Sequence, residues 1–161
     1  MGFNIAFYSI LSLLSVIICY QDLRSRLVSA WLLILYIVVL VTGTVWFSGF
    51  QVLIQNIISA ACYFLLCTLG VFTYYFLKEG QRPKIMDSKF GWADALVCIG
   101  IGISLDLISL ILFFTAAFII SAVIGLLLQQ KNKTVPLAGI LVILYLVFIC
   151  ISACFPLDLM L

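Results

Sequence analysis

The first long apolar run of the chain closes at residues 20–29, YQDLRSRLVS. These residues place the Asp22 carboxylate at the end of a segment with membrane-spanning composition, and two guanidinium groups, Arg24 and Arg26, just beyond it. An ionisable side chain at that depth in a bilayer is costly, and such residues mark functional sites by default. Because one carboxylate does little chemistry alone, we expect a partner for Asp22 elsewhere in the chain.

Apolar residues dominate the whole chain. Of its 161 residues, 66% are hydrophobic and only 9% are charged. A soluble core cannot hold this proportion, and an apolar run of about 20 residues has the length that crosses a bilayer. The sequence therefore predicts an all-α integral membrane protein with about six transmembrane helices, as a single polytopic domain over residues 1–161. The expected spans cover residues 4–20, 28–47, 52–77, 91–104, 107–128 and 136–155.

The absence of histidine and the scattered positions of the cysteines exclude several kinds of site. The chain has no histidine, which excludes a Ser-His-Asp triad, a Cys-His dyad and imidazole metal sites. Its six cysteines all lie in apolar runs without a Cys-x-x-Cys pair, so we expect small buried hydrophobic residues there. No basic run indicates nucleic acid. The sequence thus predicts no metal, no cofactor and no nucleic-acid partner.

The basic residues predict the orientation of the chain in the membrane. All eight Lys and Arg residues lie in the links after the first, third and fifth expected spans, and the other links carry none. Positive charge marks the cytoplasmic side of short loops. We therefore expect both termini outside the cytoplasm, in a multi-pass protein of the cytoplasmic (inner) membrane.

The same topology sorts the six acidic residues. Asp22, at the end of the first span, and Asp94, at the start of the fourth, fall at one depth just within the cytoplasmic face. The other four lie on the outer side or in the loop after the third span. Two carboxylates that share a proton can activate water against a peptide carbonyl and protonate the leaving amine. From position alone, an interfacial role with each aspartate paired to Arg24 or Arg26 is an equal alternative.

Three segments resemble motifs of the type IV prepilin and preflagellin peptidases, a family of intramembrane aspartic peptidases with a Gly-x-Gly-Asp motif. Residues 22–28, DLRSRLV, resemble the segment around the first aspartate of that family. Residues 91–94, GWAD, resemble the motif that carries the second aspartate, and residues 133–138, KTVPLA, resemble the segment before the final span. The resemblance covers essentially the whole chain in the small, single-domain form of the family, and it implies that Asp22 and Asp94 are the catalytic pair.

The resemblance also draws attention to residues around this pair. The candidate supporting residues are Arg24, Arg26, Gly91, Ala93 and Pro136. The arginines are ordinary orientation anchors or groups that position Asp22. Gly91, Gly100 and Gly102 are expected to serve helix packing, with the opening of a substrate path near Asp94 as the alternative. The chain departs from the family pattern at Ser29 and Ala30 in place of Pro-Asn, at Ala93 in place of glycine, and at Leu96 in place of lysine.

What the resemblance implies is a hydrolase that removes short basic leaders from type IV pilin-like precursors at the cytoplasmic face, in pilus assembly or protein secretion. Its expected partners are the precursor and the lipid bilayer, and N-methylation of the product is not implied. Two alternatives stay open: a catalytically weak or inactive homologue that acts as a membrane assembly component, and a small proton-coupled carrier. A carrier favours acids at mid-bilayer, where none of the six is expected.

The expected orientation is testable with single cysteines read by a membrane-impermeant thiol reagent. Lys84→Cys and Lys131→Cys should react only from the cytoplasmic side, and Gly49→Cys only from the outside, because the positive links stay on the cytoplasmic face. The opposite labelling pattern would overturn the orientation.

Overall fold

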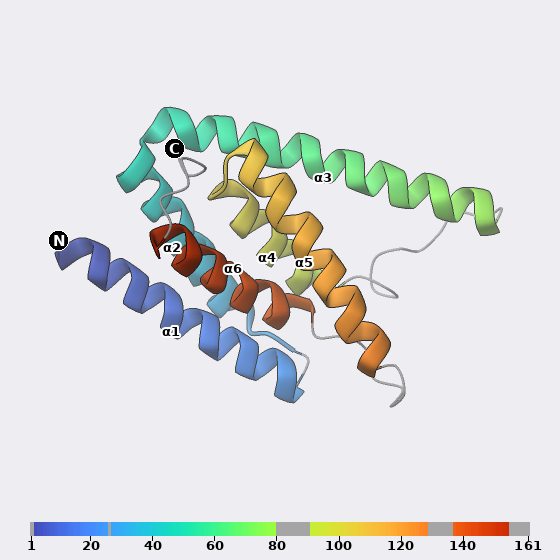
Figure 1. Cartoon of the computed structure of the whole chain (residues 1–161), viewed down its shortest axis with the longest axis horizontal. Helices are drawn as coiled ribbons and strands as arrows, with labels where there is room; N and C mark the ends of the chain where they lie inside the picture. Colours follow the sequence, from blue (N-terminus) through green and yellow to red (C-terminus); the bar gives the residue numbers. More distant parts are fainter. Residues whose placement is uncertain (1, 26, 80–90, 129–136, 155–161) are drawn as a thin grey trace.

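The computed structural model describes residues 2–25, 27–79, 91–128 and 137–154, and it is built from six helices over these ranges. They are α1 (Gly2–Ser25), α2 (Ala30–Ser48), α3 (Phe50–Glu79), α4 (Trp92–Ile103), α5 (Leu107–Leu128) and α6 (Leu137–Cys154), shown in Figure 1. The all-α class predicted from the sequence is confirmed. Four helices are long and apolar enough to cross a membrane, over Ala6–Ser25, Ala30–Ser48, Phe50–Tyr74 and Leu107–Ile124, whereas α4 and α6 are shorter apolar helices.

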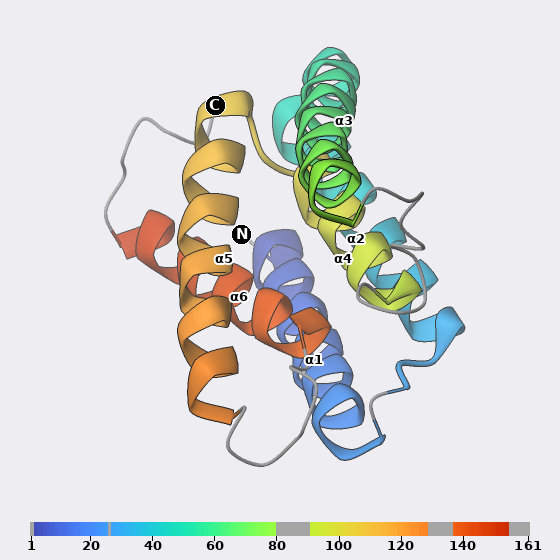
Figure 2. The same ribbon diagram turned by 90° about the vertical axis from the view of Figure 1, so that its right-hand side faces the viewer.

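The two shorter helices lie inside the bundle. In Figure 1, α1 and α3 run along opposite sides of the molecule, with the other helices between them. Helix α1 packs along α6, α2 packs along α4, and α4 also contacts α6. Figure 2 shows α5 crossing α6, against which it packs. The contacts of α6 with both α1 and α4 bring together segments that are far apart in the sequence.

Helix α1 is longer than the apolar run that predicted it. It continues through Ser25, so Asp22 lies in its last two turns and not in a link beyond its end. The Ser25 hydroxyl donates to the carbonyl oxygen of Gln21 at 2.8 Å, and the Ser29 N–H donates to the Gln21 side-chain oxygen at 3.1 Å. Hydropathy placed the end too early because backbone hydrogen bonds continue a helix whether or not its side chains are apolar.

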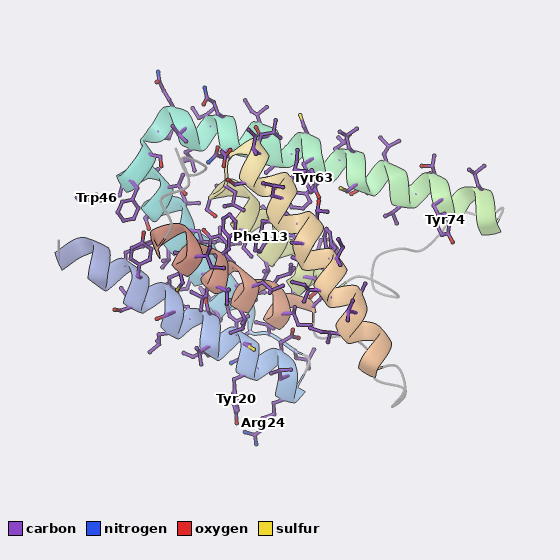
Figure 3. All side chains as sticks on the ribbon, viewed as in Figure 1. Tyr20, Arg24, Trp46, Tyr63, Tyr74 and Phe113 are labelled. Carbon is purple, nitrogen blue, oxygen red and sulfur yellow. The ribbon has the colours of Figure 1, made fainter. Side chains whose placement is uncertain are left out.

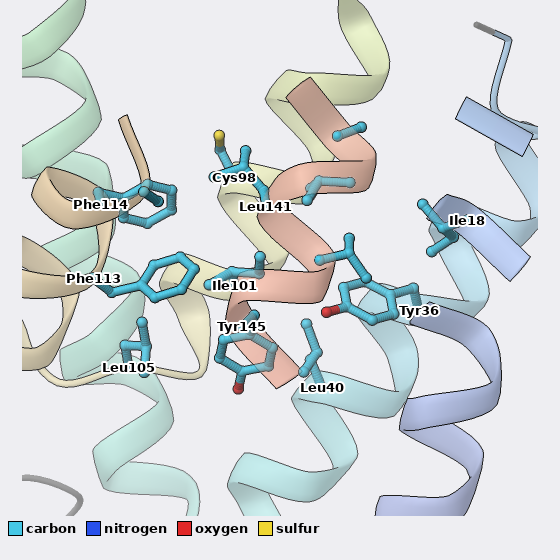
Figure 4. Packing of buried hydrophobic residues seen from close by; sticks show 14 of the residues in the cluster. Ile18, Tyr36, Leu40, Cys98, Ile101, Leu105, Phe113, Phe114, Leu141 and Tyr145 are labelled. Carbon is cyan, nitrogen blue, oxygen red and sulfur yellow. The ribbon is translucent and has the colours of Figure 1, made fainter. Parts of the chain in front are cut away.

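Buried side chains of α1, α2, α4 and α5 form one core cluster with those of α6, as Figure 4 shows. Leu141 on α6 is fully buried, and Tyr145 is 4% exposed. The Tyr145 ring packs edge-on against Phe113 of α5 with centroids 5.8 Å apart, and its hydroxyl bonds the Ser104 hydroxyl at 2.7 Å, just after α4. Because α6 is held on several sides, its first turn has a defined position relative to α1 and α4.

Glycines on α4 let the neighbouring helices approach closely. A Cβ atom on Gly100 would lie 3.0 Å from the Ile37 side chain on α2, and one on Gly102 would lie 3.0 Å from Phe64 and 3.2 Å from Ala60 on α3. Small residues at such contacts are typical of helices packed in membranes. The packing role expected for these glycines therefore agrees with their surroundings.

The cysteines do not behave as one group. The five that the structure describes have free thiols, but only Cys98 is buried. The expectation of buried cysteines is wrong for Cys62, Cys67 and Cys150, which are exposed on the outside of the bundle. In a membrane protein the outer face of a helix is as apolar as the inner face, so an apolar run does not reveal which side a cysteine occupies.

Overpacking at Gly100 should destabilise the bundle. Gly100→Ile should lower the free energy of unfolding by about 1–3 kcal/mol, because the new side chain displaces Ile37 and Leu40. Gly70→Ile is the matched control, since no atom lies within 4 Å of a Cβ atom at that helical position. Thermal unfolding in detergent measures both variants, and equal loss in the two would contradict the packing role.

Candidate active site

The Asp22 side chain lies inside the helix bundle. It is 6% exposed, and its Oδ2 atom accepts a hydrogen bond of 2.6 Å from the backbone N–H of Gly139. The two residues are 117 positions apart in the chain, so the contact is made by the tertiary fold that packs α1 against α6. Burying a carboxylate is costly unless it is hydrogen-bonded, and this bond is a charge-assisted one when the carboxylate is ionised.

Gly139 permits this contact because it has no side chain. A Cβ atom at this position would lie 3.2 Å from Asp22 Oδ2, 3.3 Å from Asp22 Cβ and 3.3 Å from the Cα atom of Cys19. Two of these atoms belong to the stem of a side chain and to the backbone of α1, which cannot move aside easily. The first turn of α6 and the last turns of α1 therefore approach each other as closely as a glycine allows.

Asp94 lies in the first turn of α4. Gly91 is the residue before the helix, and its backbone N–H donates to Asp94 Oδ2 at 3.3 Å, so the carboxylate satisfies a donor that the helix leaves free. A negative side chain also interacts favourably with the positive end of the helix dipole. Asp94 is half-buried, in contrast to the buried Asp22.

The two expected aspartates meet at the first turn of α6. The Asp94 carboxylate interacts with the backbone N–H of Ala138 and electrostatically with Asp22. Ala138 and Gly139 are consecutive residues, and N–H groups in a first helical turn have no partner within their own helix. Since each carboxylate is within reach of one of these neighbouring amides, the two carboxylates lie within about 10 Å of each other. The structure thus joins the ends of α1, α4 and α6 around two acids.

Arg24 does not belong to this group. Its guanidinium donates to the Tyr20 hydroxyl at 2.6 Å and lies 5.8 Å from the centroid of the Tyr20 ring. Figure 3 shows both side chains pointing away from the bundle. Residues two apart on a helix face different sides, so Arg24 points away from the buried Asp22. The alternative in which Arg24 neutralises Asp22 does not match this arrangement.

The other candidate supporting residues, and the departures from the family pattern near Asp94, have different surroundings. Gly91 is the N-cap of α4 and holds Asp94, as described above. Ala93 and Leu96, two of the departures from the family pattern, are half-buried and pack against the hydrophobic core. Arg26 and Pro136 lie outside the described residues.

The sequence did not predict the contribution of Ala138 and Gly139. Their donors are backbone amides, which every residue except proline carries, so no side-chain type marks them. The available signals are that the motif-like segment 133–138 ends at Ala138 and that residue 139 is a glycine near the start of an apolar run. Within the part of the chain that the structure describes, no three Cys, Asp or Glu side chains are grouped in a way that could hold a metal ion. What the site offers chemically is a pair of carboxylates and two backbone donors.

Comparison with known proteins identifies the family of the chain. Residues 9–126 match the model of the type IV leader peptidase family. No curated protein and no solved structure matches the chain. The matched range contains both Asp22 and Asp94 and ends within α5, so α6 lies beyond it. Because the match extends over most of the chain, the protein belongs to the type IV leader peptidase family.

Proposed function

We propose that the protein is an aspartic endopeptidase of the membrane that removes the short basic leader from type IV pilin-like precursors at the cytoplasmic face. The observation that supports this proposal is the meeting of Asp22 and Asp94 at the first turn of α6. Family membership supports peptidase activity, and two neighbouring carboxylates are sufficient for peptide hydrolysis without a cofactor.

In this mechanism the pair holds one proton. The ionised carboxylate takes a proton from a water molecule while the water oxygen attacks the carbonyl carbon of the scissile peptide bond. The protonated carboxyl group donates a hydrogen bond to the carbonyl oxygen and stabilises the tetrahedral intermediate. Breakdown of the intermediate breaks the C–N bond, and a proton from the pair passes to the leaving amine. Two like charges so close do not both stay ionised, which provides an acid and a base from one residue type.

The surroundings of the two aspartates differ, as is expected of a pair in which one carboxyl group acts as the base and the other as the acid. Asp22 is buried between α1 and α6, whereas Asp94 is half-buried at the start of α4. A substrate approaching the pair therefore meets Asp94 on the more open side, with Asp22 behind it. The basic links of the chain support a cytoplasmic location for this end of the bundle.

A weak or inactive homologue is the second candidate function. The observation that favours it is the packing of Ala93 and Leu96 against the core, where the family pattern has glycine and lysine. An apolar side chain at position 96 cannot supply the charge of a lysine near Asp94. The precursor cleavage assay described next distinguishes the two functions.

Asp22→Asn and Asp94→Asn should each reduce leader cleavage by about a thousandfold or more, and the double variant should be no worse than either. An amide keeps the shape of the carboxyl group but cannot exchange the proton that the mechanism requires. The assay is a gel shift of a co-expressed precursor with a short basic leader, with thermal unfolding of each purified variant in detergent.

Asp106→Asn is the matched control. This aspartate also sits at a helix start, where its Oδ2 accepts the Ile108 N–H at 3.2 Å, but it lies at the opposite end of α4 from Asp94. It should retain most of the activity. Full cleavage by either Asp22→Asn or Asp94→Asn would overturn the aspartic mechanism. Absence of cleavage by the unmutated protein would instead favour the inactive homologue, and restored cleavage in Ala93→Gly would locate the defect.

A further inference from the structure

The first turn of α6 has the properties of a rigid donor group. Its amides at Ala138 and Gly139 are directed at the two aspartates, and both residues are buried. Helix α6 is anchored one turn further on by Leu141 and Val142, both fully buried, and then by the Tyr145–Ser104 hydrogen bond. Because α6 is held in place, its amide donors cannot shift to follow an aspartate side chain that moves.

We propose that Gly139 is a positioning residue of the reaction: its backbone N–H fixes the orientation of the Asp22 carboxylate, and its lack of a side chain admits that carboxylate to the site. This inference rests on the proposed function, because it assigns to α6 a role in the same chemistry. The hydrogen bond uses Oδ2 of Asp22, so Oδ1 is the oxygen left for water or substrate. Free rotation of the carboxylate would exchange the two oxygens and lose this orientation.

The requirement for glycine at position 139 follows from the contacts already described. An alanine methyl group would lie 3.2 Å from Asp22 Oδ2 and 3.3 Å from the Cα atom of Cys19. Because the Cys19 contact is to backbone, the strain can be relieved only by moving α1 away from α6 or by rotating Asp22. Both movements lengthen the hydrogen bond between the Gly139 N–H and the Asp22 carboxylate.

The most direct test removes the donor without adding an atom. Replacement of Gly139 by glycolic acid, introduced during translation, converts one amide into an ester and deletes the N–H. The turnover number for precursor cleavage should fall about tenfold to a hundredfold, the loss expected for a hydrogen bond to a charged group, while KM changes by less than about twofold. The control is the corresponding hydroxy-acid replacement of Ile140, which changes the neighbouring amide but not the one that bonds Asp22. It should cleave at nearly the unmodified rate.

A second pair of variants tests the steric requirement. Gly139→Ala should lose cleavage to a similar or greater extent. Gly102→Ala is the matched control, because its methyl group meets Phe64 at 3.0 Å and Ala60 at 3.2 Å, an equally tight helix contact that involves neither aspartate. Equal activity loss in these two variants, or a turnover number unchanged by the ester at position 139, would overturn the positioning role.

Thermal unfolding in detergent separates this inference from the proposed function. If the N–H of residue 139 bonds Asp22, the ester should lower the unfolding midpoint in the unmutated background but not further in Asp22→Ala, because the bond is already absent there. This coupling is measured whether or not any precursor is cleaved. Coupling without cleavage by the unmutated protein overturns the proposed function and leaves only the structural part of the inference, the bond by which Gly139 holds Asp22. Additive midpoint shifts show that α6 does not hold Asp22 and overturn the inference.

Discussion

A carboxylate inside an apolar helix bundle must find hydrogen-bond donors, and for Asp22 the donor is the backbone N–H of Gly139. An unpaired buried charge destabilises a fold by several kcal/mol, so this contact constrains both helices that make it. Helix α1 must present Asp22 toward α6, and α6 must begin where its free amides face α1. Asp94 is drawn into the same arrangement by Ala138, the residue next to Gly139. The ends of three helices are thus placed relative to one another by backbone donors that no helix can satisfy internally.

The rest of the bundle keeps that meeting point in place. The aromatic contacts between α5 and α6, and the Tyr145–Ser104 bond at the far end of α4, hold the central helices without touching the aspartates. Glycines on α4 bring α2 and α3 close to it. Rigidity matters here because hydrogen bonds to a charged group lose strength with small errors of distance and angle, and a displaced carboxylate is a poor acid or base. The packing of the core therefore determines the geometry of the site.

Sequence reasoning predicted the helices and the acids but not what joins them. Apolar runs located all six helices, because each run is long and bounded by polar residues, yet they ended α1 several residues early. Charge and topology predicted one depth for Asp22 and Asp94, and this depth stays a prediction, but both side chains do lie beside the first turn of α6. The amides of Ala138 and Gly139 could not be predicted, since a backbone donor has no signature in residue type. Arg24 looked like a partner of Asp22 from proximity in sequence, but helical geometry turns it toward Tyr20.

The shortness of α4 has a consequence for the supply of water. Its 12 residues rise about 18 Å, whereas the hydrocarbon core of a bilayer is about 30 Å thick. A helix this much shorter than the hydrocarbon core cannot reach both surfaces of the bilayer, and Asp94 lies in its first turn. In the proposed mechanism each hydrolysis consumes one water molecule, which lipid cannot deliver. A helix shorter than the bilayer shortens the hydrocarbon path that this water has to cross, while the four longer helices have the length to anchor the bundle in the bilayer.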